Sequence, residues 1–267
     1  MEKVDNASEK LARDEQELFG HIDKPQTLEQ YLSSTYVPNS TKFQRYKRTL
    51  EGIFPAHNGN VLELGAGAGD LSLFCMSLFP ENRYFISELS IKHLEKHAGR
   101  TAEFFKVDVS KAKLLEVEAE HIPFEDNFFS VVLIKAAVHH FENPVKSFKE
   151  IYRVLKPSGV VVFIEDPICL DIPVYKEISK NNFSPEERKM GINEHIYTIK
   201  DYLGFAPMFA NKKYKIDPIL IEEVANQQNK RSGLKKMLFN LIIKNGKLLH
   251  AYIIQRFGSP VVFTFQK

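Results

Sequence analysis

The sequence predicts an α/β fold, a doubly wound sheet with helices on both faces. Short apolar segments of about five residues alternate along the chain with segments of helical periodicity, which is the pattern of such a sheet. Turns rich in glycine and proline separate many of these segments. One apolar segment, 129–134, is hydrophobic nearly throughout, as expected for a central parallel strand that is buried on both faces.

The first half of the sheet is expected to start at Asn60–Leu64. A glycine-rich turn and a helix over Asp70–Phe79 follow, and Pro80 ends that helix. A second strand over Arg83–Glu88 leads into a helix that we expect to stop at Gly99, because glycine is common where helices terminate.

The position of the third strand is ambiguous, since both 103–107 and 114–118 have the composition of a strand. The fourth strand is expected at 129–134 and is followed by a helix over Pro144–Leu155 with one apolar face. A Pro-Ser-Gly turn then leads into a fifth strand over Val160–Glu165.

Less regular segments flank this block. Residues 1–55 have a polar, helical pattern that includes a group of aromatic side chains. Residues 166–197 are interrupted by prolines and are too long for a simple connection, which indicates a lid or binding loop. Thr198 is expected to cap a helix, and strands are expected near 213–220 and at 260–266.

The composition is typical of a soluble globular protein that is not dedicated to nucleic acid. The chain has 267 residues, with 36 Lys and Arg against 34 Asp and Glu, and a nucleic-acid binder usually has a much larger basic excess. Its two cysteines, Cys75 and Cys169, are too few for a disulfide framework. Residues 1–17 lack the apolar core of a signal peptide, and no apolar run reaches the roughly 18 residues of a membrane span. We therefore expect a cytoplasmic location.

The most informative segment is a glycine-rich turn between the first strand and the first helix, Glu63-Leu-Gly-Ala-Gly-Ala-Gly-Asp70. Nucleoside cofactors bind at this position in α/β sheets, because glycine lets the backbone approach a ligand closely. A dinucleotide fingerprint needs G-x-G-x-x-G, but its third glycine would fall at Asp70. Glu88, which closes the second strand 25 positions after Glu63, can accept hydrogen bonds from both hydroxyls of a ribose. Together these residues indicate a ligand that contains adenosine.

Several ordered motifs make the likeness to one family specific. The chain resembles the class I S-adenosylmethionine-dependent methyltransferases, and most closely the branch that includes the quinone and sterol methylating enzymes. The likeness is strong over residues 55–166 and weak over 195–267. It is carried by the segments E-L-G-A-G-A-G-D, I-S-E-L-S, E-A-E-H-I-P-F, A-A-V-H-H-F and E-I-Y-R-V-L-K-P-S-G.

The resemblance implies a Rossmann-like sheet of seven strands, mostly parallel with an antiparallel last strand. It also implies a domain organisation, in which residues 1–55 form an N-terminal helical cap and residues 56–267 form the methyltransferase domain. In this organisation 166–197 is an insertion on the substrate side.

The resemblance further assigns the binding of S-adenosylmethionine. The residues expected around its methionine portion are Glu63, Gly65, Ala66, Gly67 and Gly69. Glu88 is expected to hold the ribose and Leu89 to lie against the adenine, while the backbone of Lys135 lies beside the methionine or sulfonium end. The acid that faces the adenine depends on the third strand: the E-A-E-H-I-P-F segment favours Glu118 with the backbone of Ala119, whereas a strand at 103–107 nominates Asp108.

The sulfonium methyl is already electrophilic, so the protein has to position a nucleophile and, for some acceptors, remove a proton. Candidate bases are His139, His140, His195 and Asp166. Enzymes that methylate amides or nucleobase amines carry an Asn/Asp-Pro-Pro-aromatic tetrad after the fourth strand, where this chain has Lys-Ala-Ala-Val-His. Methylation of amides and nucleobase amines is therefore disfavoured, which leaves O-, C- or another N-methylation. We favour O- or C-methylation of a small organic acceptor, with an RNA or protein methyltransferase or a non-catalytic cofactor-binding protein as the alternatives.

Other partners are expected to be few. His93 and His97 have the spacing of a metal pair on a helix but lack an evident third ligand, so no metal is expected. The basic stretch 235–256 could touch anionic lipid, although packing on the sheet edge is the favoured interpretation. No nucleic-acid partner is expected, and the chain is expected to be a monomer or homodimer.

Overall fold

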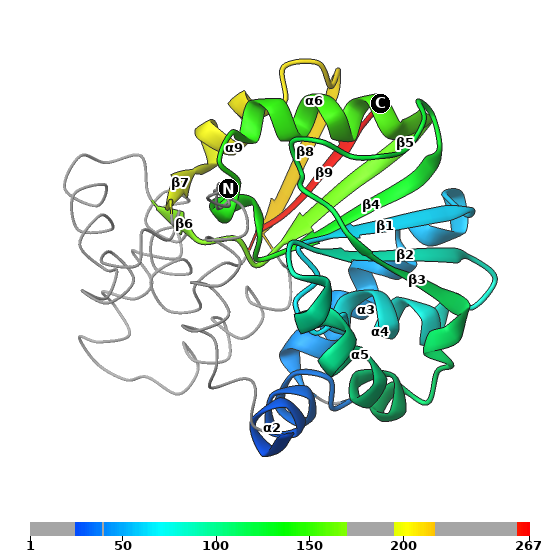
Figure 1. Ribbon diagram of the computed structural model, residues 1–267. Coiled ribbons are helices and arrows are strands. Elements are labelled where there is room, and N and C mark those ends of the chain that lie inside the picture. The colour runs from blue at the N-terminus through cyan, green and yellow to red at the C-terminus, as the bar shows by residue number, and fades with distance from the viewer. Residues whose placement is uncertain (1–24, 39, 170–194, 217–260) are drawn as a thin grey trace, which may run out of the picture.

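A seven-stranded sheet forms the centre of the protein, with helices on both faces (Figure 1). The computed structural model describes residues 25–38, 40–169, 195–216 and 261–267. The predicted α/β class and the doubly wound arrangement are confirmed.

The strand order is β3-β2-β1-β4-β5-β9-β8. The strands are β1 (Asn60–Leu64), β2 (Arg83–Glu88), β3 (Ala112–Glu116), β4 (Phe129–Lys135), β5 (Leu155–Ile164), β8 (Asn211–Ile216) and β9 (Val261–Gln266). The pairs among β1 to β5 are parallel, and β9 is antiparallel to both of its neighbours, as predicted for the last strand. The order reverses between β1 and β4, so the crevice beyond their carboxyl ends is the place where α/β sheets bind ligands.

The central strands are apolar because helices cover both of their faces. All residues of β4 except Lys135 are buried, which matches the continuous hydrophobic run in the sequence. Successive residues point to opposite faces, so Val61 and Val131 join one hydrophobic cluster while Leu62 and Val132 join the other.

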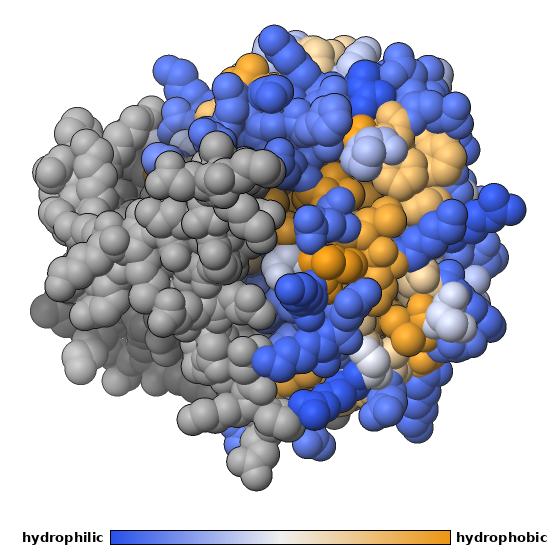
Figure 2. All heavy atoms as spheres, in the orientation of Figure 1, coloured by the Kyte–Doolittle hydropathy of each residue, from blue (hydrophilic) through white to orange (hydrophobic). Residues whose placement is uncertain are grey.

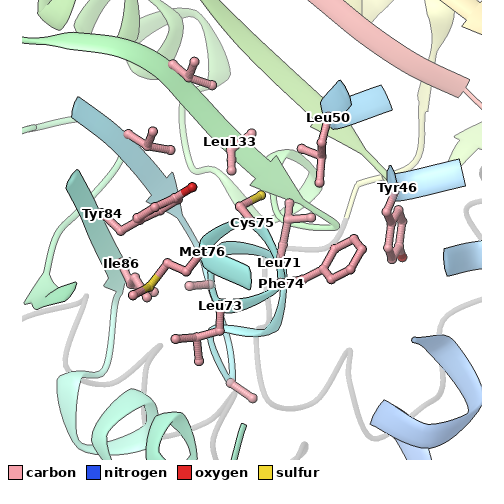
Figure 3. Close-up of a cluster of buried hydrophobic side chains, with 14 of the residues drawn as sticks. Tyr46, Leu50, Leu71, Leu73, Phe74, Cys75, Met76, Tyr84, Ile86 and Leu133 are labelled. Carbon is pink, nitrogen blue, oxygen red and sulfur yellow. The ribbon is translucent and has the colours of Figure 1, made fainter. Parts of the chain in front are cut away.

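One face of the sheet is covered by helices from the N-terminal part of the chain. These are α2 (Pro25–Thr35), α3 (Thr41–Glu51), α4 (Asp70–Leu78) and α5 (Ile91–Phe105). Figure 3 shows Leu71 and Phe74 of α4 among the strands and the α3 side chains Tyr46 and Leu50. The described part of residues 1–55 is therefore helical, as expected, and its buried side chains join the same hydrophobic cluster as those of α4.

The other face carries α6 (Pro144–Val154) and α9 (Ile199–Phe205). The N-terminus of α9 is a capping box, in which the Thr198 side chain accepts from the Asp201 N–H and the Asp201 carboxylate accepts from the Thr198 N–H. The predicted cap at Thr198 is confirmed. A short parallel pair, β6 (Ile168–Cys169) with β7 (Tyr197–Thr198), lies beside α9.

The surface follows this layered arrangement. In the face shown in Figure 2, hydrophilic side chains cover the outer helices, and hydrophobic residues come to the surface between the upper and lower helical layers. None of the described helices is long and apolar enough to cross a bilayer.

Three sequence-based boundaries need correction. Helix α5 runs through Gly99 to Phe105, because its buried face continues at Thr101 and Ala102 and packing outweighs the weak helix propensity of one glycine. It ends instead at Lys106, which has a left-handed backbone with φ of 57°. The third strand is Ala112–Glu116, so the alternative at 103–107 is wrong. Strand β5 starts at Leu155 and includes the Pro-Ser-Gly segment expected to form a turn.

Candidate functional site

The glycine-rich turn leaves β1 and enters α4 with three glycines in the left-handed region. Their φ angles are 64° at Gly65, 55° at Gly67 and 75° at Gly69, which caps α4. A side chain at Gly65 would bring a Cβ to 2.6 Å from the Ala137 Cβ, whereas one at Gly67 would meet no atom within 4 Å. The turn therefore needs glycine for its conformation, and its middle faces open space that a ligand could fill.

Glu88 is held against this turn at the end of β2. Its Oε2 accepts a 2.5 Å hydrogen bond from the Gly67 N–H, and its Oε1 accepts one of 2.8 Å from the Leu89 N–H. Burial raises the pKa of Glu88, and these two backbone hydrogen bonds act in the opposite direction. The carboxyl group is therefore fixed beside the loop, where the sequence places a ribose.

Glu63 lies beneath the turn and is fully buried. Its Oε2 accepts a 3.0 Å hydrogen bond from the Ser72 N–H of α4, but Oε1 has no partner among the described residues. Burial raises the pKa of Glu63 to about 8, and hydrogen bonds from Ser72 only partly oppose this. A buried carboxyl oxygen without a partner is uncommon and is consistent with a site that a polar ligand completes.

The adenine side of the site depends on β3. Glu118 and Ala119 follow the carboxyl end of β3. They lie near the end of β2, because the N–H of the adjacent Val117 donates to the Glu88 carbonyl at 3.2 Å. Asp108 lies at the opposite end of β3, exposed, where it caps a short 3₁₀ turn by accepting from Ser110. The structure brings Glu118 and Ala119 toward Glu88 and places Asp108 away from them.

The three candidate histidines gather at the carboxyl ends of β4 and β5. A single oxygen of the buried Asp166, Oδ1, lies 3.1 Å from the His139 backbone nitrogen and 2.9 Å from its Nδ1. The rings of His139 and His140 lie 4.0 Å apart, and the His195 N–H donates to the His139 carbonyl at 3.1 Å. The arrangement fixes the His139 ring with Nδ1 as the donor toward Asp166.

Sequence reasoning missed a side-chain contact at the same edge. Lys135 was nominated only for its backbone, yet its ammonium pairs with Asp70 and donates to the Tyr31 hydroxyl at 2.6 Å. The aromatic group of residues 1–55 was the only sequence signal, because the partners lie far apart in the chain.

Some predictions lie outside the described residues. These are most of the insertion 166–197 and the basic stretch 235–256. Within the described ranges, no group of three or more His, Cys, Asp or Glu side chains is placed to hold a metal ion.

Known proteins similar to this chain are methyltransferases or share their fold. A family model described as "Methyltransferase domain" matches residues 62–163. The ubiquinone/menaquinone biosynthesis C-methyltransferase UbiE of Francisella tularensis subsp. novicida is 32% identical over 137 residues, covering 50% of this chain and 54% of that relative. The chain thus spans about half the length of the curated relatives it matches.

Solved structures agree at the level of the fold. Phosphoethanolamine N-methyltransferase 2 of Haemonchus contortus, solved with S-adenosylmethionine, superposes with a TM-score of 0.56 and 18% identity, over 92% of this chain and 59% of that one. The [4+2]-cyclase SpnF superposes with a TM-score of 0.55 and 14% identity, over 85% of this chain and 82% of that one. The fold by itself therefore does not specify a reaction.

The glycine turn, Glu63 and Glu88 fit an adenosine-bearing cofactor, since they provide a turn with open space at Gly67, one buried carboxyl group and one half-buried carboxyl group. Residues 62–163 match a methyltransferase domain, and the sheet has the Rossmann-like fold of the class I S-adenosylmethionine-dependent methyltransferases.

Proposed function

We propose that this chain transfers the methyl group of S-adenosylmethionine to a carbon or oxygen of a small organic acceptor. The observation that carries the proposal is the left-handed glycine turn, with the partly satisfied Glu63 beneath it and Glu88 fixed at its side. The match of the methyltransferase domain to residues 62–163, which include all three features, supports it.

We assign the cofactor contacts as follows. Gly65, Ala66, Gly67 and Gly69 leave room for its methionine portion, and Glu63 accepts a hydrogen bond through Oε1. Glu88 accepts from the ribose hydroxyls through lone pairs that the Gly67 and Leu89 amides do not use. Leu89, Ala119 and Glu118 line the adenine side. Asp108 is not part of this assignment, because it lies at the opposite end of β3.

When bound, S-adenosylmethionine supplies a methyl group on a positively charged sulfur that needs no further activation. His139 is the proposed general base. The hydrogen bond from Nδ1 to Asp166 leaves Nε2 as the nitrogen that can take a proton from an acceptor hydroxyl, and the Asp166 carboxylate stabilises the imidazolium that results. General-base assistance of this kind is typically worth about 10²- to 10⁴-fold in rate.

A small phenolic or quinol acceptor fits these features. The relatives named as quinone C-methyltransferases support this class, and the near-neutral charge of the chain argues against a nucleic-acid substrate. Loss of a phenolic proton raises the nucleophilicity of both the oxygen and the ring carbons, so one base serves O- and C-methylation. The cap and the insertion 166–197 are proposed to cover the acceptor.

The test is methyl transfer from S-adenosylmethionine labelled in its methyl group to three pools: small organic extracts, RNA and protein. Label is expected in the organic pool, with a rate at least about 100-fold lower for His139→Gln. The matched variant His140→Gln alters the neighbouring ring and is expected to retain most of the activity. Label confined to RNA or protein, or no transfer by a protein that binds the cofactor, would contradict the proposal.

A further inference from the structure

A buried ion pair lies where the cap helices meet the glycine turn. The side chain of Lys135 is 10% exposed, and its ammonium contacts Oδ2 of Asp70 and the Tyr31 hydroxyl. The hydroxyls of Tyr31 and Tyr36 donate to the same Oδ2, at 3.2 and 2.5 Å. The rings of Tyr31, Tyr36 and Tyr46 surround the ammonium, with centroids 5.2, 5.8 and 5.9 Å away. These five residues are called the tyrosine–lysine cluster.

Lys135 is charged in the folded protein. Burial is the largest influence on the pKa of Lys135 and lowers it, but the combined charges of Asp70 and the groups around it raise this pKa well above the usual range. Burial, reinforced by the charge of Asp70, raises the pKa of Tyr36, so its hydroxyl keeps its proton and acts as a donor. A buried pair of this kind contributes little net stability, because desolvation offsets the attraction. Stability alone therefore gives no strong reason for its presence.

The cluster borders the proposed cofactor site directly. Asp70 is the first residue of α4 and follows Gly69, and Lys135 follows Ile134, the partner of Leu64 in the β1–β4 ladder. The charges of Asp70 and Lys135 both act on the buried Glu63, whose Oε1 has no partner in the described part of the chain. A cation, an anion and a partly satisfied carboxyl group thus lie together beside the open space at Gly67.

We propose that the tyrosine–lysine cluster receives the α-amino-acid end of the cofactor. The Lys135 ammonium and the Tyr31 hydroxyl bind its carboxylate, while Asp70 binds its ammonium. This inference rests on the proposed function. An α-amino acid is a zwitterion. Its carboxylate can replace Asp70 as the partner of Lys135, and its ammonium can replace Lys135 as the partner of Asp70. The exchange therefore leaves no buried charge unpaired.

One consequence is that cap helix α2 is part of the cofactor site, because Tyr31 lies on it. A second is selectivity. A nucleoside thioether without the amino-acid end can use the glycine turn and Glu88 but gains nothing from Lys135 or Tyr31.

The test compares the affinities of two ligands by calorimetry, S-adenosylhomocysteine and 5′-methylthioadenosine, which lacks the amino-acid end. In Lys135→Met the affinity for S-adenosylhomocysteine is expected to fall by about 10- to 100-fold, as for loss of a charge-assisted hydrogen bond. The affinity for 5′-methylthioadenosine is expected to change by less than about 3-fold. Tyr31→Phe, which keeps the Asp70–Lys135 pair, should show a smaller loss of affinity, confined to S-adenosylhomocysteine. This variant provides the comparison if Lys135→Met does not fold.

The control variant is Lys47→Met, which removes an exposed ammonium from α3 that pairs with Glu51 at 3.7 Å. It is expected to leave both affinities unchanged. Equal losses for the two ligands, or an unchanged affinity for S-adenosylhomocysteine in both cluster variants, would overturn the inference while the proposed function stands. A wild-type protein that binds neither ligand would instead refute the proposed function and the inference with it.

Discussion

The protonation of Glu63 links the stability of the fold to pH. Its pKa is about 8 in the folded protein and near 4.5 in an unfolded chain. Between these values the folded state holds a proton that the unfolded state has released, so the free energy of unfolding falls as pH rises through this window. Glu63→Gln cannot titrate. As the pH rises from 6 to 8, the free energy of unfolding of the variant should therefore increase by about 2 kcal/mol relative to that of the wild type, measured by urea denaturation. A difference independent of pH would contradict the raised pKa.

Substitutions at two glycines of the turn test separately the need for close packing and the need for ligand access. Gly65→Ala should lower the free energy of unfolding by about 2–4 kcal/mol, because the new Cβ meets Ala137 and φ is positive. Gly67→Ala should cost only about 1–2 kcal/mol but weaken S-adenosylhomocysteine binding by 10-fold or more (about 1.4 kcal/mol per tenfold), because its Cβ enters the open space of the site. Gly99→Ala, on α5, is the control and should stabilise the protein without changing binding. Full cofactor affinity in Gly67→Ala would show that the ligand does not approach this turn.

At the residue scale, the sequence predicted the positions of side chains that depend on local patterns, whereas their roles in binding stay predictions. The turn and Glu88 were identified because spacing relative to a strand end determines their position. The Lys135–Tyr31 contact was missed because it joins residues 104 positions apart, and no local pattern reports such a distance. The hydrogen bonds from His139 to Asp166 were missed for the same reason, although both residues were nominated as bases.

At the scale of elements, Arg153 on α6 fixes the loop that carries the adenine-side residues. Its guanidinium donates to the carbonyls of Ile122 and Phe124, at 2.8 and 2.7 Å, and to Glu150 and Asp126. Arg153→Lys keeps the charge but not the planar array of donors. It should lower the free energy of unfolding by about 1–2 kcal/mol and also weaken adenosine binding. Lys149→Met, at an exposed position of α6, should stay within about 0.5 kcal/mol of the wild type. Equal stability of the two variants would contradict this role.

Element boundaries show what the sequence could and could not predict. Strands β1 and β2 were predicted at their observed limits, because each is a short apolar run bounded by turn residues. The end of α5 was not predicted, since the buried face beyond Gly99 is evident only once the sheet is in place. The third strand is only partly buried at the edge of the sheet, so its hydrophobic pattern is weak.

At the scale of the whole molecule, helices α2 and α3, which are proposed to form the cap, share a hydrophobic cluster with one face of the sheet. Leu50 of α3 is 2% exposed and belongs to the cluster that includes α4. Leu50→Ala should therefore lower the free energy of unfolding by about 2–5 kcal/mol in a single transition, monitored by far-ultraviolet circular dichroism during heating. Val37→Ala, at a site that is 44% exposed, should have little effect. Separate transitions for the cap and the sheet would show instead that the cap is an independent appendage.

The central claim is that the glycine turn and its carboxyl groups bind S-adenosylmethionine. The most direct measurement is the melting temperature of the wild-type chain with S-adenosylhomocysteine, with a nicotinamide dinucleotide as the comparison ligand. A ligand at 100 times its dissociation constant stabilises a protein by about 2.7 kcal/mol, which predicts a rise of about 5–10 °C with S-adenosylhomocysteine and none with the dinucleotide. No rise with S-adenosylhomocysteine, or a rise with the dinucleotide alone, would contradict the account.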